Sequence, residues 1–201
     1  PTTAGTGSEV TPYSILTNDA KRTKTSITSP AMFPRLAYLD GKYMRDLPAA
    51  TTVNTALDAF SHAVEGMLSR NGTPLSDALA RESLRILYPL LSKTAGTLTL
   101  EERDTLLYAS ALAGMTIAQS GTTAVHGMGY SLTYFYNIDH GRANGLLLGA
   151  TLRLCEKKGV PALQEILSAC GDTLDGVCAT IDTLLGEREA IPAERLEEFA
   201  A

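Results

Sequence analysis

The sequence has no tryptophan, three cysteines and three histidines among its 201 residues. The cysteines are Cys155, Cys170 and Cys178, an odd number without Cys-x-x-Cys spacing. That usage excludes a disulfide framework and predicts reduced thiols in helical segments of a cytoplasmic protein. Because histidine is so scarce, the places where it occurs carry more information than its number.

Long apolar runs and basic clusters are also missing. The stretch from residue 143 to 155 is interrupted by Arg153 and is too short to cross a membrane. The chain has 17 basic and 22 acidic residues, a net charge of -5, and no basic stripe. This charge pattern argues against a nucleic acid partner. We therefore predict neither a nucleic acid nor a membrane as partner, and no signal peptide is recognisable.

Residues 1–45 predict a β-rich leader. Short extended segments are expected at residues 10–17, 23–28 and 36–39, where β-branched and apolar residues lie between turn signals. A segment of this size cannot bury a core by itself. We expect it to complete a sheet or to pack against the rest of the chain.

From residue 46 onward the pattern is helical. Apolar residues recur at three-to-four spacing near residues 50–70, 74–92, 100–119, 121–136, 141–157, 161–170, 173–186 and 192–200. Thr99 and Glu102 have the spacing of a capping box, and Gly159 is a stop signal after two lysines. The predicted fold is mainly α, a multi-helix bundle behind the short β-rich leader.

All three histidines lie between Ala56 and His140, close to one carboxylate at helical spacing. Asp58 and His62 are four residues apart, so they share one face of a helix. His126 lies in a helical segment, and His140 would open a new helix after a break at residues 137–139. One carboxylate and three imidazoles suit Fe²⁺, Zn²⁺, Mn²⁺ or Co²⁺. An isolated Asp/His pair at this spacing is more often a surface or capping pair, so spacing alone leaves both interpretations open.

The opening segment PTTAGTGSEVT interleaves threonines with glycines. Such a loop can bring its backbone close to a ligand and offer N–H groups and hydroxyls to phosphate or ribose oxygens. It lacks the lysine of a P-loop and the third glycine of a dinucleotide fingerprint. A plain Gly/Thr turn is therefore the alternative.

The chain resembles the iron-containing (group III) alcohol dehydrogenase family, which has the dehydroquinate synthase-like fold. Three segments carry the resemblance: TTAGTGSEVT at 2–11, DLPAATTVNTALDAFSHAVEG at 46–66, and the HG…HGRANGLLL pattern across 126–148. They occur in order and at spacing like that of the family. The resemblance covers residues 1–157, and the remaining residues match as generic helices.

The resemblance implies a metal-dependent enzyme that transfers hydride between a nicotinamide cofactor and a small alcohol or aldehyde. It implies Fe²⁺ or Zn²⁺ as the metal and NAD or NADP as the cofactor, and it leaves a homodimer open. The implied metal ligands are Asp58, His62, His126 and His140. The implied cofactor contacts are Thr2, Thr3, Gly5, Thr6, Gly7, Ser8 and Lys24.

Two features depart from the family pattern. There is no Gly-Gly-Gly-Ser phosphate loop, so we expect a C-terminal portion of the family's polypeptide, inactive alone. Residues 1–45 would then be a remnant edge of the nucleotide-binding domain, and residues 46–201 a helical metal-binding domain. Secondly, Tyr130 stands where many members carry a proton-relay histidine, and its hydroxyl is the candidate relay here. A non-catalytic helical domain and a dehydroquinate synthase-like metal-dependent lyase remain as alternatives.

Overall fold

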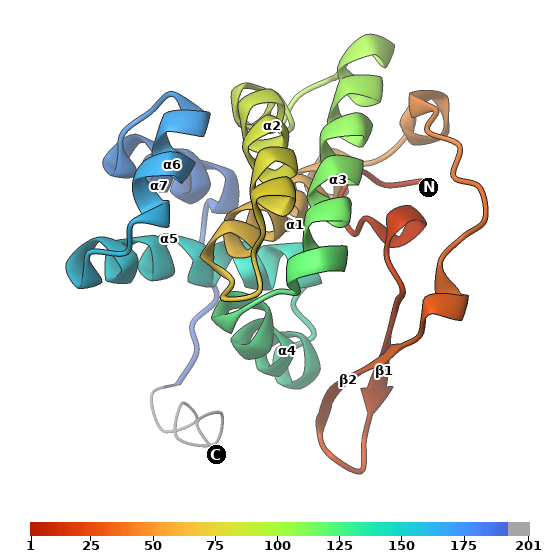
Figure 1. Cartoon of the computed structure of the whole chain (residues 1–201), viewed down its shortest axis with the longest axis horizontal. Coiled ribbons are helices and arrows are strands. Elements are labelled where there is room, and N and C mark those ends of the chain that lie inside the picture. Colours follow the sequence, from red (N-terminus) through yellow and green to blue (C-terminus); the bar gives the residue numbers. More distant parts are fainter. Residues whose placement is uncertain (193–201) are drawn as a thin grey trace.

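Seven α-helices make up most of residues 1–192, the part of the chain that the computed structural model describes (Figure 1). They are α1 (Ala49–Leu68), α2 (Pro74–Leu91), α3 (Leu100–Ser120), α4 (Ala124–Tyr136), α5 (His140–Lys158), α6 (Ala162–Cys170) and α7 (Leu174–Leu185). The mainly helical fold class is confirmed, and these helices coincide with the first seven predicted segments. The helix expected near residues 192–200 lies, apart from Pro192, outside the described residues.

The helix ends follow the local chemistry of the sequence. Thr99 and Glu102 form the predicted capping box at the start of α3, and Gly159 ends α5 in the left-handed conformation. Helix α4 begins three residues later than expected, because Gly121 has a φ of 70° and breaks the helical path after α3. None of the described helices is both long and apolar enough to span a membrane.

Helix α1 occupies the centre of the molecule. Every residue from Ala56 to Met67 is buried, because α1 contacts α2, α3 and α5 on different sides. Leu57 and Phe60 are fully buried, and burial of side chains of this size stabilises the fold by about 1.5–3 kcal/mol each. Polar residues of α1 are enclosed as well, so each of them needs a partner inside the protein.

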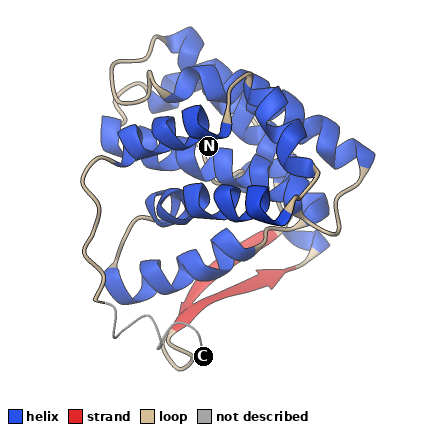
Figure 2. Cartoon of the chain, turned by 90° about the vertical axis from the view of Figure 1, so that its left-hand side faces the viewer, coloured by secondary structure: helices blue, strands red, loops and turns tan. Residues whose placement is uncertain are grey.

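The leader contains one antiparallel hairpin, formed by β1 (Tyr13–Asn18) and β2 (Thr23–Thr28). Tyr13 pairs with Thr28, and the hairpin lies along one edge of the helical assembly (Figure 2). The leader packs on the helices, as expected: the Tyr13 hydroxyl donates a hydrogen bond to the Ile117 carbonyl of α3 at 2.8 Å.

Two of the strand predictions need correction. Residues 8–10 form the 3-10 helix η1 (Ser8–Val10), so β1 starts later than residue 10. Residues 36–39 form no strand: within residues 1–192 the only sheet consists of β1 and β2. Leu36 and Tyr38 are 73% and 77% exposed, so this segment covers no apolar core. Two further 3-10 helices, η2 (Pro30–Met32) and η3 (Gly41–Met44), connect the hairpin to α1.

The start of α5 lies directly against α1 at Gly141. A Cβ atom at this position would overlap the Asn54 carbonyl of α1. The Asn54 side chain also donates a hydrogen bond to the Asp139 carboxylate at 2.7 Å. These two contacts fix the first turn of α5 against the first half of α1.

We expect Gly141→Ala to lower the free energy of unfolding by about 1–3 kcal/mol, because the added methyl group has no space between the two helices. Gly127→Ala is the matched control: Gly127 is exposed within α4, and a Cβ there meets nothing within 4 Å. That variant should gain roughly 0.5–1 kcal/mol from the higher helix propensity of alanine. Urea unfolding followed by circular dichroism measures both, and equal stabilities would contradict the proposed contact.

Candidate metal centre

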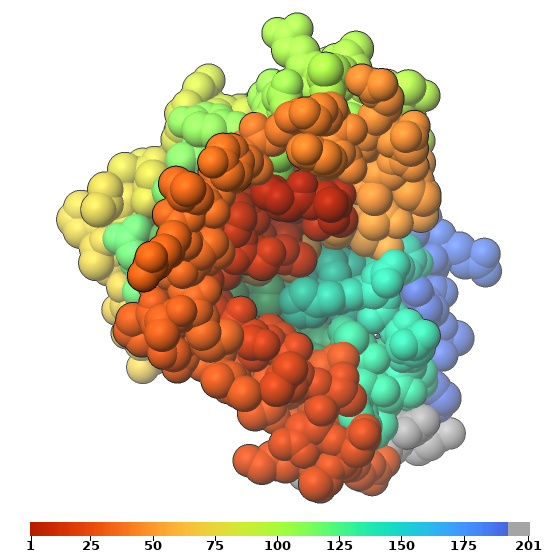
Figure 3. All heavy atoms as spheres, turned by 90° about the vertical axis from the view of Figure 1, so that its right-hand side faces the viewer, coloured from red at the N-terminus to blue at the C-terminus, as the bar shows by residue number. Residues whose placement is uncertain are grey.

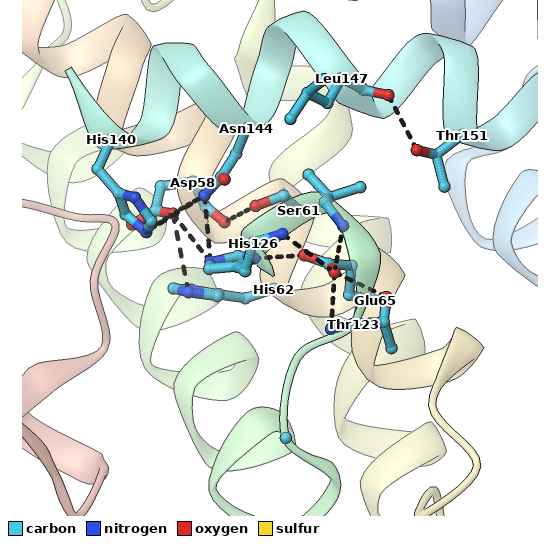
Figure 4. A network of polar contacts seen from close by, with 12 residues as sticks. Asp58, Ser61, His62, Glu65, Thr123, His126, His140, Asn144, Leu147 and Thr151 are labelled. Carbon is cyan, nitrogen blue, oxygen red and sulfur yellow. Dashed lines mark hydrogen bonds and ion pairs between the residues drawn. The ribbon is translucent and has the colours of Figure 1, made fainter. Parts of the chain in front are cut away.

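Three helices bring the predicted ligands to one point (Figure 4). Asp58 and His62 lie one turn apart on α1, His126 is in the first turn of α4, and His140 is the first residue of α5. The Oδ1 atom of Asp58 is 3.7 Å from His62 Nε2, 3.5 Å from His126 Nε2 and 3.6 Å from His140 Nε2. Three imidazole nitrogens therefore surround one carboxylate oxygen.

These separations fit a shared divalent cation. Ligand atoms about 2.1 Å from a tetrahedral cation lie roughly 3.4 Å from one another, close to the distances around Asp58. The candidate ligand atoms of Asp58, His126 and His140 all lie within 4.8 Å of one another. His62 is not part of this group of three, but its ring stacks on His126 with centroids 4.7 Å apart. A carboxylate with imidazoles is a donor set that suits Fe²⁺ or Zn²⁺.

The ligands differ in exposure. Asp58, His62 and His126 are buried, whereas the side chain of His140 is 34% exposed. His140 takes this position because Asn137, with a φ of 53°, ends α4 in the left-handed conformation and lets the chain reverse. The centre is thus closed on the side of α1 and open on the side of His140.

The electrostatics of the four groups are coupled. Burial opposes ionisation of Asp58, but His62 and a hydrogen bond from His126 outweigh it and hold the pKa of this carboxyl below its usual range. Burial lowers the pKa of His62 to about 4 and lowers the pKa of His140 as well. Burial has the same effect on His126, yet hydrogen bonds to Asp58 and to Glu65 outweigh it and raise its pKa to about 9.

Glu65 belongs to the site although the sequence suggested no role for it. It is fully buried on α1, one turn beyond His62. Its carboxylate accepts hydrogen bonds from the Thr123 N–H and hydroxyl, each at 2.7 Å, and it contacts Nδ1 of His126. The signal in the sequence was its spacing, because Glu65 falls on the same strip of α1 as Asp58 and His62.

Asn144 is a second residue that sequence reasoning missed. It is fully buried one turn after His140 on α5. Its amide nitrogen donates to Asp58 Oδ1 at 2.9 Å and lies 3.1 Å from His126 Nε2 and 3.3 Å from His140 Nε2. The i, i+4 spacing from His140 was the available signal.

A cleft of about 620 Å³ opens above the centre, between the leader and α4. Figure 3 shows the surface hollowed between the red and orange leader and the teal residues of α4 and α5. Its lining includes Thr6, Ser8, Tyr13, Lys24, Asp58, His62, His126, Tyr130, Thr133 and His140. The cleft therefore joins the predicted metal ligands to part of the predicted cofactor loop.

Thr6, Ser8 and Lys24 line this cleft, whereas the other predicted cofactor residues do not. Thr2 is exposed and Thr3 half-buried away from it. Lys24 Nζ donates to the Thr17 hydroxyl at 2.8 Å across the hairpin.

The two glycines of the loop pack against helices. A Cβ at Gly5 would lie 2.5 Å from the Thr55 carbonyl oxygen of α1. Gly7 has a φ of 59°, and a Cβ there would lie 2.6 Å from Gly114 Cα of α3. The glycines thus let the leader backbone approach the helices, and the contact of Gly5 and Gly7 with a cofactor stays a prediction.

Tyr130 lies in the wall of the cleft. Its ring stacks on His140 with centroids 5.8 Å apart and an interplanar angle of 18°. Burial raises the pKa of Tyr130, and the Asp58 and Glu65 carboxylates add to this shift. The phenol is therefore neutral at physiological pH and holds a proton beside the centre.

Comparison with known proteins defines the family. The family described as Fe-containing alcohol dehydrogenase family, C-terminal, matches residues 52–199, and the family described as Iron-containing alcohol dehydrogenase matches residues 1–41. The chain belongs to the iron-containing alcohol dehydrogenase family, as the sequence motifs indicated.

The 1,3-propanediol dehydrogenase of Klebsiella pneumoniae is 34% identical over 182 residues, which are 90% of this chain and 47% of that protein. The lactaldehyde reductase of Escherichia coli K12 is 37% identical over 154 residues, which are 76% of this chain and 40% of the reductase. The chain thus spans about half the length of the curated relatives it matches.

Two solved structures extend the comparison. An iron-containing alcohol dehydrogenase from Thermotoga maritima is 42% identical with a TM-score of 0.89, over 99% of this chain and 54% of that chain. A sulfoacetaldehyde reductase from Bifidobacterium kashiwanohense in complex with NAD⁺ is 29% identical with a TM-score of 0.84. The match covers 99% of this chain and 56% of the reductase chain.

We expect His126→Ala to weaken zinc binding by at least about 10–100-fold, because the variant lacks one of the four donors. Ser83→Ala is the control, since it removes a buried hydrogen bond of 2.8 Å between α2 and α3 away from the centre. Competition with a chromophoric chelator measures both affinities. Stoichiometric metal retained in His126→Ala under such competition would count against the assigned ligand set.

Proposed function

We propose that this chain carries the metal-binding part of a nicotinamide-dependent dehydrogenase that interconverts small alcohols and aldehydes. The observation that carries the proposal is the grouping of three imidazoles around Asp58 beneath a cleft that also contains Thr6, Ser8 and Lys24. We propose Fe²⁺ as the cation, with Zn²⁺ as the other candidate, held by Asp58 and the three histidines.

The relatives support the class of substrate and cofactor. Their names refer to propanediol, lactaldehyde and sulfoacetaldehyde, which are small molecules with an alcohol or aldehyde group. The structure with NAD⁺ supports a nicotinamide cofactor, and we propose NAD before NADP on that basis. A homodimer and a cytoplasmic location remain predictions from the sequence.

A divalent cation bound at this site supplies Lewis acidity toward the oxygen of the alcohol or aldehyde. The residues of the chain position the reactants around it. The Thr6 and Ser8 hydroxyls and the Lys24 ammonium offer donors to the oxygens of the cofactor from the leader side of the cleft. A nicotinamide cofactor held by these donors would supply the hydride chemistry in the same cleft as the metal ligands.

The decisive experiment joins this chain to the preceding half of the Thermotoga maritima relative. The iron-loaded chimera should reduce NAD⁺ with 1,3-propanediol or another small alcohol as the hydride donor. The formation of NADH is measured by its absorbance. Asp58→Asn in the same chimera should abolish turnover, because the shared carboxylate ligand is neutralised. A folded, metal-loaded chimera without turnover on small alcohols, with NAD⁺ or NADP⁺, would favour the non-catalytic alternative.

We propose Tyr130 as the proton relay between the cleft and solvent. In the chimera, Tyr130→Phe should lower kcat by roughly 10²-fold, because the ring keeps its stacking on His140 but loses its exchangeable proton. Tyr130→His should retain more activity than Tyr130→Phe, since an imidazole can also transfer protons. Equal kcat values for the wild type and Tyr130→Phe would exclude this role.

A further inference from the structure

We infer that Glu65 is a positioning residue of the metal centre, which orients the His126 imidazole so that Nε2 faces the cation. The inference rests on the metal site of the proposed function. It also assigns Glu65 a second task at the same atoms: its carboxylate closes the N-terminus of α4. One buried side chain of α1 would then fix both the helix that carries His126 and the imidazole itself.

The two carboxylate oxygens have separate partners (Figure 4). Oε1 accepts from the Thr123 N–H and hydroxyl at 2.7 Å, from the Val125 N–H at 3.1 Å and from the His126 N–H at 3.4 Å. Oε2 faces Nδ1 of His126. Glu65 has no exposed surface, so these groups replace water completely.

This arrangement determines which imidazole nitrogen carries the proton. Four donors converge on Oε1, which favours the ionised carboxylate, and an ionised carboxylate only accepts hydrogen bonds. Nδ1 of His126 therefore donates to Oε2. With Nδ1 as the donor to Oε2, Nε2, which lies 3.5 Å from Asp58 Oδ1, is the ring nitrogen that can give its lone pair to a bound cation in place of a proton.

Helix α4 depends on the same carboxylate. Its N-cap residue Thr123 makes no side-chain capping bond, so the first N–H groups of α4 lack a local acceptor. Glu65 supplies one from α1, and a negative charge at a helix N-terminus is favourable. Any displacement of Glu65 would therefore shift the backbone of His126 together with its ring.

Glu65→Gln tests the inference. The amide oxygen can still accept from the N–H groups of α4, but the amide nitrogen then faces Nδ1 of His126 and donates to it. The imidazole proton must move to Nε2, where it blocks the ligand atom. We expect the apo variant to keep its helical circular dichroism and to bind Zn²⁺ roughly 10–100-fold more weakly than the wild type.

Glu102→Gln is the matched control. Glu102 also closes a helix N-terminus, from within α3 itself: it accepts from the Thr99 N–H at 2.9 Å and pairs with the Lys93 ammonium at 2.7 Å, away from the histidines. The Glu102→Gln variant should bind Zn²⁺ with the same affinity as the wild type. Affinities are measured by chelator competition with Zn²⁺ alone, so the readout does not depend on turnover.

The outcomes separate the two claims. If the wild-type chain binds no Zn²⁺ or Fe²⁺, the proposed function fails. If the wild type and Glu65→Gln bind Zn²⁺ equally, only the role of Glu65 is overturned. If Glu65→Gln does not fold, long-range ¹H–¹⁵N spectra of the zinc-loaded wild type decide. They should show His126 bound through Nε2 with a proton on Nδ1, and zinc on Nδ1 would refute the inference.

Discussion

The burial of charged and polar groups on α1 is the constraint on which the rest of the structure depends. Asp58 and Glu65 are almost fully removed from water at the centre of the helical assembly. A buried carboxylate destabilises a protein unless donors surround it. The fold supplies those donors from α4 and α5, so the same contacts that stabilise the core also bring the proposed metal ligands together.

The starts of α4 and α5 place the histidines of these helices beside the buried carboxylates of α1. α4 and α5 both begin beside α1, and each presents a histidine within its first turn. Gly141 lets α5 approach α1, and the Asn54 to Asp139 hydrogen bond fixes that approach. A cleft bordered by the leader remains above the ligands.

The helices were predictable because their signals are local. The apolar spacing and the capping box at Thr99 specify helices through residues only a few positions apart. The strand expected at residues 36–39 failed for the opposite reason. A strand needs a hydrogen-bonding neighbour, and within residues 1–192 no segment pairs with this one, although its side chains have the composition of a strand.

By itself, the sequence determined the helical fold and the chemical types of the proposed ligands, since Asp58 and His62 share a helix face in any tertiary arrangement. Only the tertiary structure decided which groups complete the site. Glu65 meets Thr123 across 58 residues, and Asn144 meets Asp58 across 86. Helical spacing places Glu65 and Asn144 on the same helix faces as the histidines, but it does not give their partners on other helices, because those contacts arise from the packing of α4 and α5 against α1.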